Sequence, residues 1–260
     1  MRWFVLLVAT VVILAAGSRF MAVSAQTPRA LTVAAASDLQ SALPGIIQGF
    51  EREANATVTV SFGSSGNFFA QIQNGAPYDI YLSADIDYPK RLVASGHADA
   101  SSLYQYATGR LVLWTRKDSG IDIRGGLRSL TGARVTRIAI ANPKYAPYGR
   151  AAEAALRYEK IYDAVQGKLV LGENISQTAQ LVDSGNASVG IIALSLAVGP
   201  ALRARGTYTE IPAAAHPPID QAVVIISSST RKPLAREFLA YLKRPDISGH
   251  LHAFGFAAGR

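Results

Sequence analysis

The sequence predicts an α/β protein with two lobes, each containing a mostly parallel β-sheet flanked by helices. Three observations lead to this prediction. Short apolar runs rich in β-branched residues alternate with amphipathic helical patterns along the chain. Most of the runs are continuously apolar, which is typical of strands buried on both faces of a parallel sheet. Two polar or proline- and glycine-rich breaks, at 116–126 and 212–220, interrupt the alternation.

The apolar runs predict eight strands. These cover 31–36, 57–62, 79–84, 110–115, 137–142, 168–173, 188–193 and 221–227. Helical periodicity between the runs predicts helices that include 38–53, 149–165 and 232–244. Strands that alternate with helices of this length form a parallel sheet with helices packed on its faces.

The two breaks predict where the chain passes from one lobe to the other. If the chain crosses near both, the central block forms an inserted lobe, and the C-terminal helix completes the lobe that the N-terminal portion began. The predicted boundaries are 26–114 together with 217–260 for the first lobe, and 115–216 for the second.

The first 25 residues have the features of a secretory signal peptide. Arg2 provides positive charge, 4–16 form an uncharged apolar run too short to span a bilayer, and small residues precede position 26. We therefore expect cleavage of 1–25, export, and a mature protein in the periplasm. An uncleaved membrane anchor is the alternative that this pattern leaves open.

The composition limits the chemistry available to the chain. Cysteine is absent, which excludes disulfides, thiolate catalysis and cysteine-based zinc sites. The chain has 26 basic and 18 acidic residues, and loss of 1–25 removes two basic residues and no acid, so the net charge falls from +8 to +6. This charge favours encounter with anions. Without a Lys/Arg-rich block or an aromatic platform, the sequence does not predict nucleic-acid binding.

Four strand-to-helix turns carry groups suited to anion binding. In an α/β sheet, ligands bind beyond the carboxyl ends of the strands, where helices begin. Each helix start leaves backbone N–H groups without intrahelical partners and carries partial positive charge, so several converging starts can hold a dehydrated dianion. The turns contain Ser37 with Gln40 at capping-box spacing, Ser64 and Ser65 before Gly66, Pro147 to Gly149, and Asn174 with Gln177 at the same spacing.

A simpler interpretation exists for each turn taken alone. A serine or asparagine at a helix start is most often only an N-cap, and Tyr148 and Ile175 can be ordinary packing residues. The number of such turns, rather than any one of them, favours an anion site. At the second turn we expect Ser65 and the Gly66 N–H to contact the ligand, and Ser64 to cap the helix.

Enzymatic functions find less support in the sequence. Ser64 and Ser65 lie in Gly-Ser-Ser-Gly, one residue short of the Gly-x-Ser-x-Gly nucleophile elbow. A serine hydrolase also needs a histidine base, and the four histidines lie in predicted loops or on different faces of one helix. We predict a protein that is not an enzyme, with no catalytic residues and no cofactor, and keep a periplasmic serine hydrolase as the less favoured alternative.

The mature chain resembles the periplasmic molybdate-binding proteins of ABC importers. The resemblance rests on the ordered stretches "LTVAAASDLQSALPGIIQGFE", "VSFGSSGNFFAQIQNGAPYDIYLSAD" and "RIAIANPKYAPYGRAAEAAL", and it continues to the C-terminus. It implies the type II-like two-lobe fold of periplasmic binding proteins, with two crossover segments, closing over one molybdate or tungstate oxyanion. It also implies delivery to a membrane permease, with molybdenum present only as the bound oxyanion and without direct metal ligands. We expect a monomer.

The resemblance assigns four residues to the ligand. Ser37 matches the serine of the family's AAAS motif, and Ser65 the second serine of its S-F-x-S-S motif. Tyr148 matches the residue before glycine in N/D-P-x-x-x-P-x-G, and Ile175 matches an apolar amide donor at a later helix start. Some members have a tyrosine where this sequence has Ala193, so we hypothesise that the phenol of Tyr148 replaces that donor.

Two other binding functions are compatible with these residues. A sulfate- or phosphate-selective receptor would use the same donors and is the alternative within the binding proteins. An effector domain of a transcription regulator shares the two-lobe architecture, but the signal peptide and the absence of an N-terminal DNA-binding helix pair argue against it. The sequence does not separate molybdate from tungstate.

Overall fold

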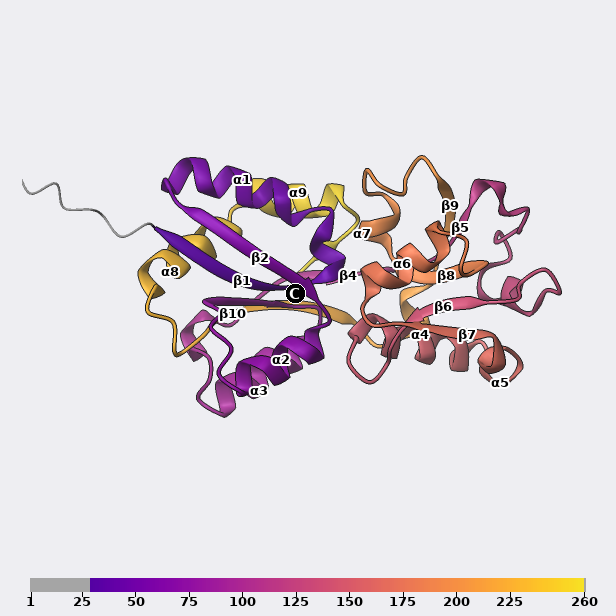
Figure 1. Ribbon diagram of the computed structural model, residues 1–260, viewed down its shortest axis with the longest axis horizontal. Helices are drawn as coiled ribbons and strands as arrows, with labels where there is room; N and C mark the ends of the chain where they lie inside the picture. Colours follow the sequence, from indigo (N-terminus) through magenta and orange to yellow (C-terminus); the bar gives the residue numbers. More distant parts are fainter. Residues whose placement is uncertain (1–28, 260) are drawn as a thin grey trace, which may run out of the picture.

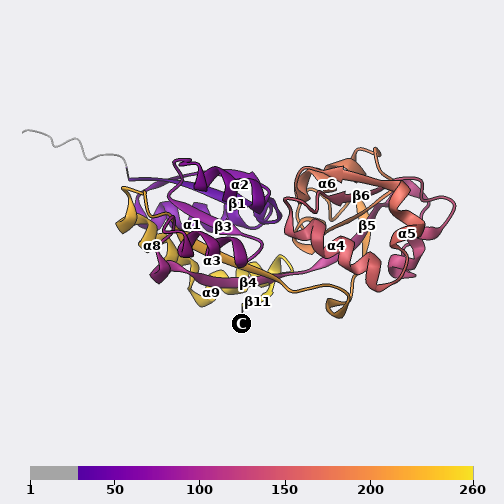
Figure 2. The same cartoon turned by 90° about the horizontal axis from the view of Figure 1, so that it is seen from below.

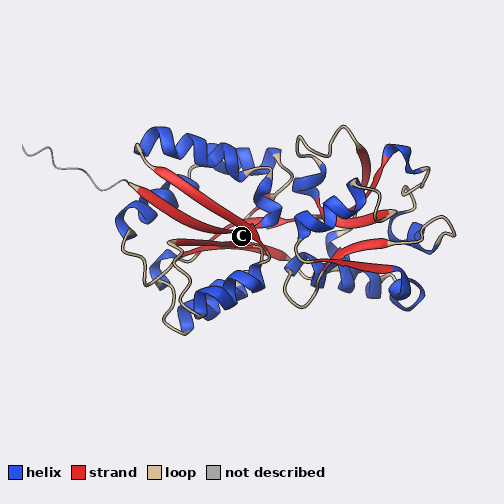
Figure 3. Ribbon diagram, in the orientation of Figure 1, coloured by secondary structure: helices blue, strands red, loops and turns tan. Residues whose placement is uncertain are grey.

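The computed structural model describes residues 29–259, which form two lobes lying side by side (Figure 1). The predicted signal peptide, 1–25, lies outside the described residues. One lobe contains a six-stranded sheet and the other a five-stranded sheet, and helices flank both (Figure 3). Within 29–259, no helix combines the length and apolarity needed to cross a membrane. The predicted two-lobe α/β fold is confirmed.

The first sheet has the strand order β11-β4-β10-β3-β1-β2. β1 pairs in parallel with β2 and β3, whereas β10 runs antiparallel to β3 and β4. The strands are β1 (Ala30–Ala36), β2 (Thr57–Gly63), β3 (Ile80–Ser83), β4 (Tyr104–Gly109), β10 (Ile219–Ile225) and β11 (Ala257–Ala258). The parallel half of this sheet is the part whose strands lead directly into helices.

Helices cover both faces of the first sheet. Val33 and Ala35 of β1 pack against one set of helices, and Ala34 between them packs against the other, as the two-residue alternation of a strand requires. The first set comprises α1 (Leu43–Ala54), α8 (Lys232–Leu242) and α9 (Pro245–Ala253), and the second comprises α2 (Ser65–Gln73) and α3 (Asp87–Ala94). Phe50 of α1 meets Phe238 of α8 edge to face, with ring centroids 5.0 Å apart.

The second sheet has the order β7-β6-β8-β5-β9. β6 pairs in parallel with β7 and β8, and β5 runs antiparallel to β8 and β9. Its strands are β5 (Leu111–Arg116), β6 (Ile138–Ala141), β7 (Leu169–Gly172), β8 (Val189–Ala193) and β9 (Gly206–Glu210). Its helices are α4 (Pro147–Tyr158), α5 (Tyr162–Val165), α6 (Ile175–Asp183) and α7 (Leu194–Ala197). The two lobes therefore share one plan, a parallel half that feeds helices and an antiparallel half. Neither sheet is mostly parallel as predicted, because the strands next to the crossings between the lobes pair antiparallel.

Short 3-10 helices connect these elements. They are η1 (Ser37–Gln40), η2 (Ala100–Ser102), η3 (Lys117–Ser119), η4 (Gly126–Thr131), η5 (Gln166–Lys168) and η6 (Ala213–Ala215). η1 replaces the start of the helix predicted over 38–53, and α1 begins only at Leu43. The helix predicted over 149–165 is also interrupted, because Lys160 adopts a left-handed backbone conformation with φ of 58° between α4 and α5.

All eight predicted strands are present, with ends that differ by a few residues. β4, β9 and β11 are not among the predicted strands. β4 (YQYATG) and β9 (GTYTE) mix polar residues into the run, so they lack the continuous apolar signal of the other strands. β11 has only two residues, both exposed.

The chain crosses between the lobes twice. β4 ends at Gly109 in the first sheet and β5 begins at Leu111 in the second, while the return lies between β9 and β10. Gly109 pairs with Ile219 at the start of β10, so the two crossing segments lie side by side (Figure 2). The predicted boundary at 114 would divide β5, so we propose Arg110 as the first crossing point instead. The second predicted boundary, between 216 and 217, stays a prediction.

We expect Phe238→Ala to destabilise the first lobe by about 3–5 kcal/mol, because the deleted ring is fully buried and leaves a cavity between α8 and α1. Urea denaturation followed by circular dichroism measures the free energy of unfolding. Tyr158→Ala is the control, since that ring is 60% exposed and its loss should change stability by no more than about 0.5 kcal/mol. Equal effects of the two substitutions would contradict the assigned core.

Candidate functional site

A small cavity lies where the two lobes meet, with about 180 Å³ of space that includes open solvent and with room for about one water molecule. It is located beyond the carboxyl ends of β1, β2 and β3, and helices of both lobes begin at its walls. The four residues predicted from the sequence are among those that line it. The lining residues are Ala36, Ser37, Asp38, Gly63, Ser64, Ser65, Ala84, Ala146, Pro147, Tyr148 and Ile175.

Four helix starts face this cavity. Ser37 begins η1, Ser65 is the first residue of α2, Tyr148 is the second of α4, and Ile175 is the first of α6. Main-chain N–H groups at these positions have no partner within their helices, and the starts of the three α-helices carry partial positive charge. Within the part of the chain that the structure describes, no Lys or Arg lines the cavity. The arrangement can therefore bind an anion through neutral donors.

The serines of the second turn have different roles. The side chain of Ser64 accepts a hydrogen bond from Asn67 N (3.4 Å), so it caps α2 as predicted. The buried hydroxyl of Ser65 accepts from Ala84 N (3.0 Å). Because a hydroxyl has one proton of its own, Ser65 can donate that proton to a ligand while it accepts from the backbone.

The Gly66 N–H does not face a ligand, and this expectation was wrong. It donates to Tyr145 O (2.9 Å), a carbonyl of the other lobe. The two backbones come so close that a Cβ at position 66 would lie 2.7 Å from the same carbonyl. Gly66 is therefore needed for contact between the lobes rather than for contact with the ligand.

Ser37 also connects the lobes. The predicted capping box does not form, since Ala36 precedes η1 and makes no side-chain cap. Instead, the hydroxyl of Ser37 donates to Asn174 Oδ1 (3.2 Å) and accepts from Ser176 N (3.3 Å). Asn174 itself caps α6 by accepting from Gln177 N (3.0 Å), as predicted. The Ser37 hydroxyl thus lies at the start of α6 as well as at the start of η1.

Asp38 is a site residue that the sequence analysis missed. It is fully buried and lines the cavity. Its Oδ2 accepts hydrogen bonds from the Tyr148 hydroxyl (3.0 Å) and from Gln221 Nε2, and its main-chain oxygen accepts from the Ser195 hydroxyl (2.7 Å). Among the described residues, its Oδ1 has no hydrogen-bond partner. The available signal was an acid two residues beyond the end of a continuously apolar strand.

Burial changes the titration of this carboxyl group. It raises the pKa of Asp38 from its usual 3.8 to about 6, because the charged form loses its hydration. The hydrogen bonds from Gln221 and Tyr148 lower the pKa, but by less than burial raises it. Burial, together with the neighbouring carboxylate, also raises the pKa of Tyr148 well above its ordinary value, so the phenol keeps its proton.

The hydroxyl of Tyr148 is therefore committed to Asp38. Its one proton goes to Asp38 Oδ2, and Gln221 Nε2 donates to its oxygen (3.3 Å). The hypothesis that the phenol replaces a donor missing at Ala193 finds no support in this geometry. The main-chain N–H of Tyr148, in the first turn of α4, is the group that this residue can offer to a ligand.

Further contacts hold the lobes together around the cavity. Arg150 of α4 forms an ion pair with Asp85 and donates to the Tyr88 hydroxyl (3.2 Å). Asn67 Nδ2 donates to Glu173 Oε1 (3.4 Å). Partly exposed pairs of this kind contribute little stability individually. Together they connect the starts of α3 and α2 in the first lobe with α4 and the start of α6 in the second, so the two lobes are closed over the site.

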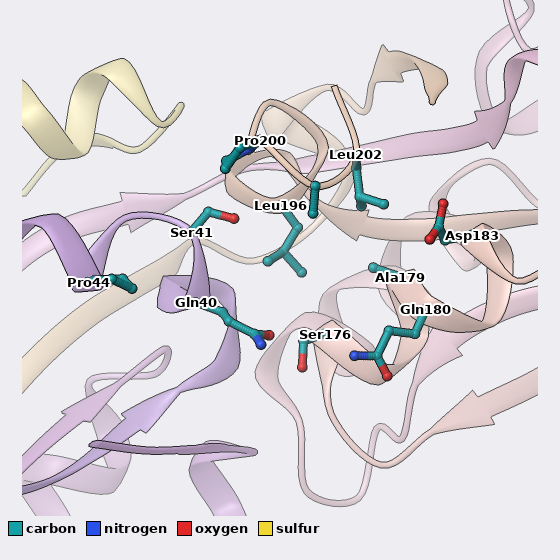
Figure 4. Close-up of a pocket in the computed structure, with 11 residues that line it drawn as sticks. Gln40, Ser41, Pro44, Ser176, Ala179, Gln180, Asp183, Leu196, Pro200 and Leu202 are labelled. Atoms are coloured by element: carbon teal, nitrogen blue, oxygen red, sulfur yellow. The ribbon is translucent and has the colours of Figure 1, made fainter. Parts of the chain in front are cut away.

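A second, larger hollow lies between the lobes, with about 1090 Å³ of space that includes open solvent (Figure 4). Its walls come from the η1–α1 segment and from α6, α7 and the turn that follows α7. They include the carboxylate of Asp183 and apolar side chains such as Leu196 and Leu202, with no Lys or Arg. α1, α6 and α7 all begin near its walls, but the lining combines a carboxylate with apolar side chains, so this hollow suits an anion less well than the smaller cavity does.

Comparison with known proteins agrees with this architecture. A family model described as bacterial extracellular solute-binding protein matches residues 31–257. The chain belongs to this family. The predicted class, a solute-binding protein rather than an enzyme, is the class of the family. Within 29–259, the solute-binding protein also has no group of three or more acidic or histidine side chains that could hold a metal ion.

Two curated relatives of this solute-binding protein carry a ligand in their names. The molybdate-binding protein ModA of Azotobacter vinelandii is 35% identical over 244 residues, which cover 94% of this chain and 96% of the relative. ModA of Rhodobacter capsulatus is 35% identical over 207 residues, 80% of each chain. The solved structure of the Azotobacter vinelandii periplasmic molybdate-binding protein matches with a TM-score of 0.83 and 33% identity, covering 88% of this chain and 100% of that chain. The predicted resemblance is confirmed.

We expect the stability difference between wild type and Asp38→Asn to depend on pH. The pKa of Asp38 is higher in the folded protein than its usual value, so the wild-type carboxyl favours folding at low pH and loses that contribution as the pH rises through about 6. The change is roughly 2 kcal/mol between about pH 4.5 and pH 8. Urea denaturation of the ligand-free proteins across this range measures it, and parallel curves for the two proteins would contradict the buried position of Asp38.

Proposed function

We propose that this protein binds molybdate or tungstate between its two lobes and delivers it to the membrane permease of an ABC importer. In this proposal it acts in the periplasm as a monomer, without a cofactor and without catalysis. Ser37, Ser65, Tyr148 and Ile175 contribute hydroxyl or main-chain donors to the anion. The observation that carries the proposal is the convergence of four helix starts on one buried cavity that contains no basic side chain.

Neutral donors are sufficient for a dianion. A favourable helix dipole contributes about 0.3–1 kcal/mol, and a hydrogen bond to a charged group about 1.5–3 kcal/mol. Several such contacts give useful affinity without a buried Lys or Arg. The charge of such a side chain would itself have to be desolvated. A carrier protein must also release its ligand, and hydrogen bonds from neutral groups are compatible with both binding and release.

The named relatives support molybdate as the ligand. Molybdate, tungstate, sulfate and phosphate share tetrahedral geometry, so selection between them depends on the size of the cavity and on protons carried by the anion. Both walls of the cavity are closed here by contacts between the lobes, such as Gly66 N to Tyr145 O. A site bounded by two packed lobes limits size more strictly than an open surface would. A sulfate- or phosphate-selective receptor is the alternative.

Closure provides the signal for delivery. A ligand shifts the balance between open and closed lobes only by its differential affinity for the two states. An anion that contacts Ser65 in one lobe and Ile175 in the other binds fully only when the lobes are closed. A permease that recognises surfaces of both lobes in that arrangement would distinguish loaded from empty protein.

We expect molybdate and tungstate to raise the melting temperature of the mature protein more than sulfate or phosphate do. A ligand that binds only the native state adds about 2.7 kcal/mol at one hundred times its dissociation constant, which corresponds to roughly 5–10 °C for a chain of this size. Differential scanning fluorimetry with each anion makes the comparison. A shift with sulfate and none with molybdate would refute the proposed ligand, and turnover of a neutral ester would refute the class.

We expect Ser65→Ala to weaken molybdate binding about ten- to one-hundred-fold, because a hydrogen bond to a charged ligand is lost. Isothermal titration calorimetry measures the affinity. Ser102→Ala is a matched control: Ser102 is also buried, also accepts from a main-chain N–H (Ile225 N, 2.8 Å), and lies outside the cavity. Equal affinities of the two variants would remove Ser65 from the site.

A further inference from the structure

We propose that Asp38 is a further ligand-binding residue, and that one proton lies between its carboxyl group and the bound oxyanion. This inference rests on the proposed function, since it concerns the same cavity. A carboxylate is not an obvious ligand for a dianion, because the two repel each other. A proton between the two groups removes this repulsion.

One carboxylate oxygen of Asp38 has no partner. Asp38 is one of the residues that line the cavity, together with the four predicted ligand residues, and it is fully buried. Oδ2 is occupied by two donors, whereas Oδ1 has no hydrogen-bond partner among the described residues. A buried polar atom without a partner costs free energy comparable to a lost hydrogen bond. A ligand oxygen in the cavity would give Oδ1 a partner, provided that a proton lies between the two atoms.

No positive charge faces Asp38 from the elements packed around it. α4 contributes the hydroxyl of Tyr148, and β10 contributes the amide of Gln221. β4 contributes Tyr106, whose hydroxyl donates to Gln221 Oε1 (2.9 Å) and so orients the amide with its N–H toward Asp38. Tyr106 and Tyr148 both have pKa values raised by burial, so both are neutral.

Besides the hydrogen bonds from Gln221 and Tyr148, only main-chain N–H groups favour a charged carboxyl group here. The backbone N–H groups of Asp38 and Leu39 lie close enough to lower the pKa of the side chain. The hydroxyl of Ser195 on α7 donates to the main-chain oxygen and does not touch the carboxyl group. Among the described residues, no Lys, Arg or His lines the cavity that could offset a second negative charge when a dianion enters.

The proton comes from one of two sources. With a fully deprotonated oxyanion such as molybdate, an ionised Asp38 takes one proton from solvent, and the resulting O–H donates to a ligand oxygen. With hydrogen phosphate, the ligand brings its own O–H, which donates to the ionised carboxylate. In both cases one proton is shared by the pair, and its titration belongs to the pair rather than to either group.

The sign of the pH effect follows from the first case. A bound dianion favours the neutral form of a nearby acid, so the pKa of Asp38 rises above about 6 when molybdate binds. Above pH 6 the free protein has lost the proton that the complex holds. Binding must then take up a proton, and affinity falls as the pH rises.

Calorimetric titration of the mature protein with molybdate, from about pH 6.5 to about pH 9, tests the inference. We expect the dissociation constant to rise by up to about ten-fold per pH unit, which is the limit for uptake of one proton. Titrations at one pH in two buffers of different ionisation enthalpy should show uptake of about one proton per anion. A pH-independent dissociation constant without proton uptake would overturn the inference while leaving molybdate binding intact.

Asp38→Asn separates the proton from the hydrogen bond. The amide oxygen can still accept from Tyr148 and Gln221, and the amide N–H can donate to the ligand without taking up a proton. We expect this variant to bind molybdate with an affinity that does not change with pH and without proton uptake. A variant that melts like the wild type but binds no molybdate would overturn the donor role of Asp38.

Asp79→Asn is the matched control. Asp79 is another buried carboxylate of the first lobe, outside the cavity, where it accepts from Thr32 N (2.7 Å) and from the Ser229 hydroxyl (2.7 Å). This variant should retain the pH dependence and proton uptake of the wild type. If it loses them as Asp38→Asn does, the effect is not specific to the cavity and the inference fails.

Phosphate distinguishes failure of the inference from failure of the proposed function. Tight binding of phosphate that is lost in Asp38→Asn, with no binding of molybdate, would refute the proposed ligand and support the shared proton. Absence of binding with every oxyanion, at every pH, would refute both.

Discussion

The site depends on main-chain N–H groups that have no partner within their own helices. η1, α2, α4 and α6 all begin where the lobes meet, and a buried donor must be satisfied from outside its helix. The opposite lobe satisfies some of these groups: Tyr145 O accepts from Gly66 N, and the Ser37 hydroxyl accepts from Ser176 N. The donors that remain are those that an anion can use, so binding and closure of the lobes depend on the same set of groups.

The sheets determine why the helix starts meet. Parallel strands place their carboxyl ends at one edge, and in each lobe the parallel half of the sheet is the half followed by helices. The antiparallel strands β4 and β10 connect the lobes instead. β4 ends where the first crossing begins, β10 begins where the second crossing ends, and Gly109 pairs with Ile219. Two adjacent crossings connect the lobes at one place and leave the opposite edges, which carry the helix starts, able to close on a ligand.

Asp38 shows how the same closure controls charge. Its carboxyl group belongs to the first lobe, but the hydroxyl of Tyr148 reaches this group from the second lobe, and the hydroxyl of Ser195 reaches the main-chain oxygen of Asp38. Separation of the lobes would remove these two partners and return the carboxyl group toward water, where the charged form is favoured. Closure, desolvation and protonation of this group are therefore linked, which gives a site without basic residues a way to accommodate a dianion.

Local sequence determined the strands, the helices and the turn residues. Continuous apolar runs were sufficient for eight strands, and Ser64 could be distinguished from Ser65 because an N-cap is a contact within four residues. Only the tertiary structure decided the antiparallel pairing of β4 and β9, the use of the Gly66 N–H between lobes, and the importance of Asp38. Asp38 and Gln221 are 183 residues apart in the chain. The pKa of a buried acid depends on the water and the donors around it, and no local pattern records which distant groups the fold will bring there.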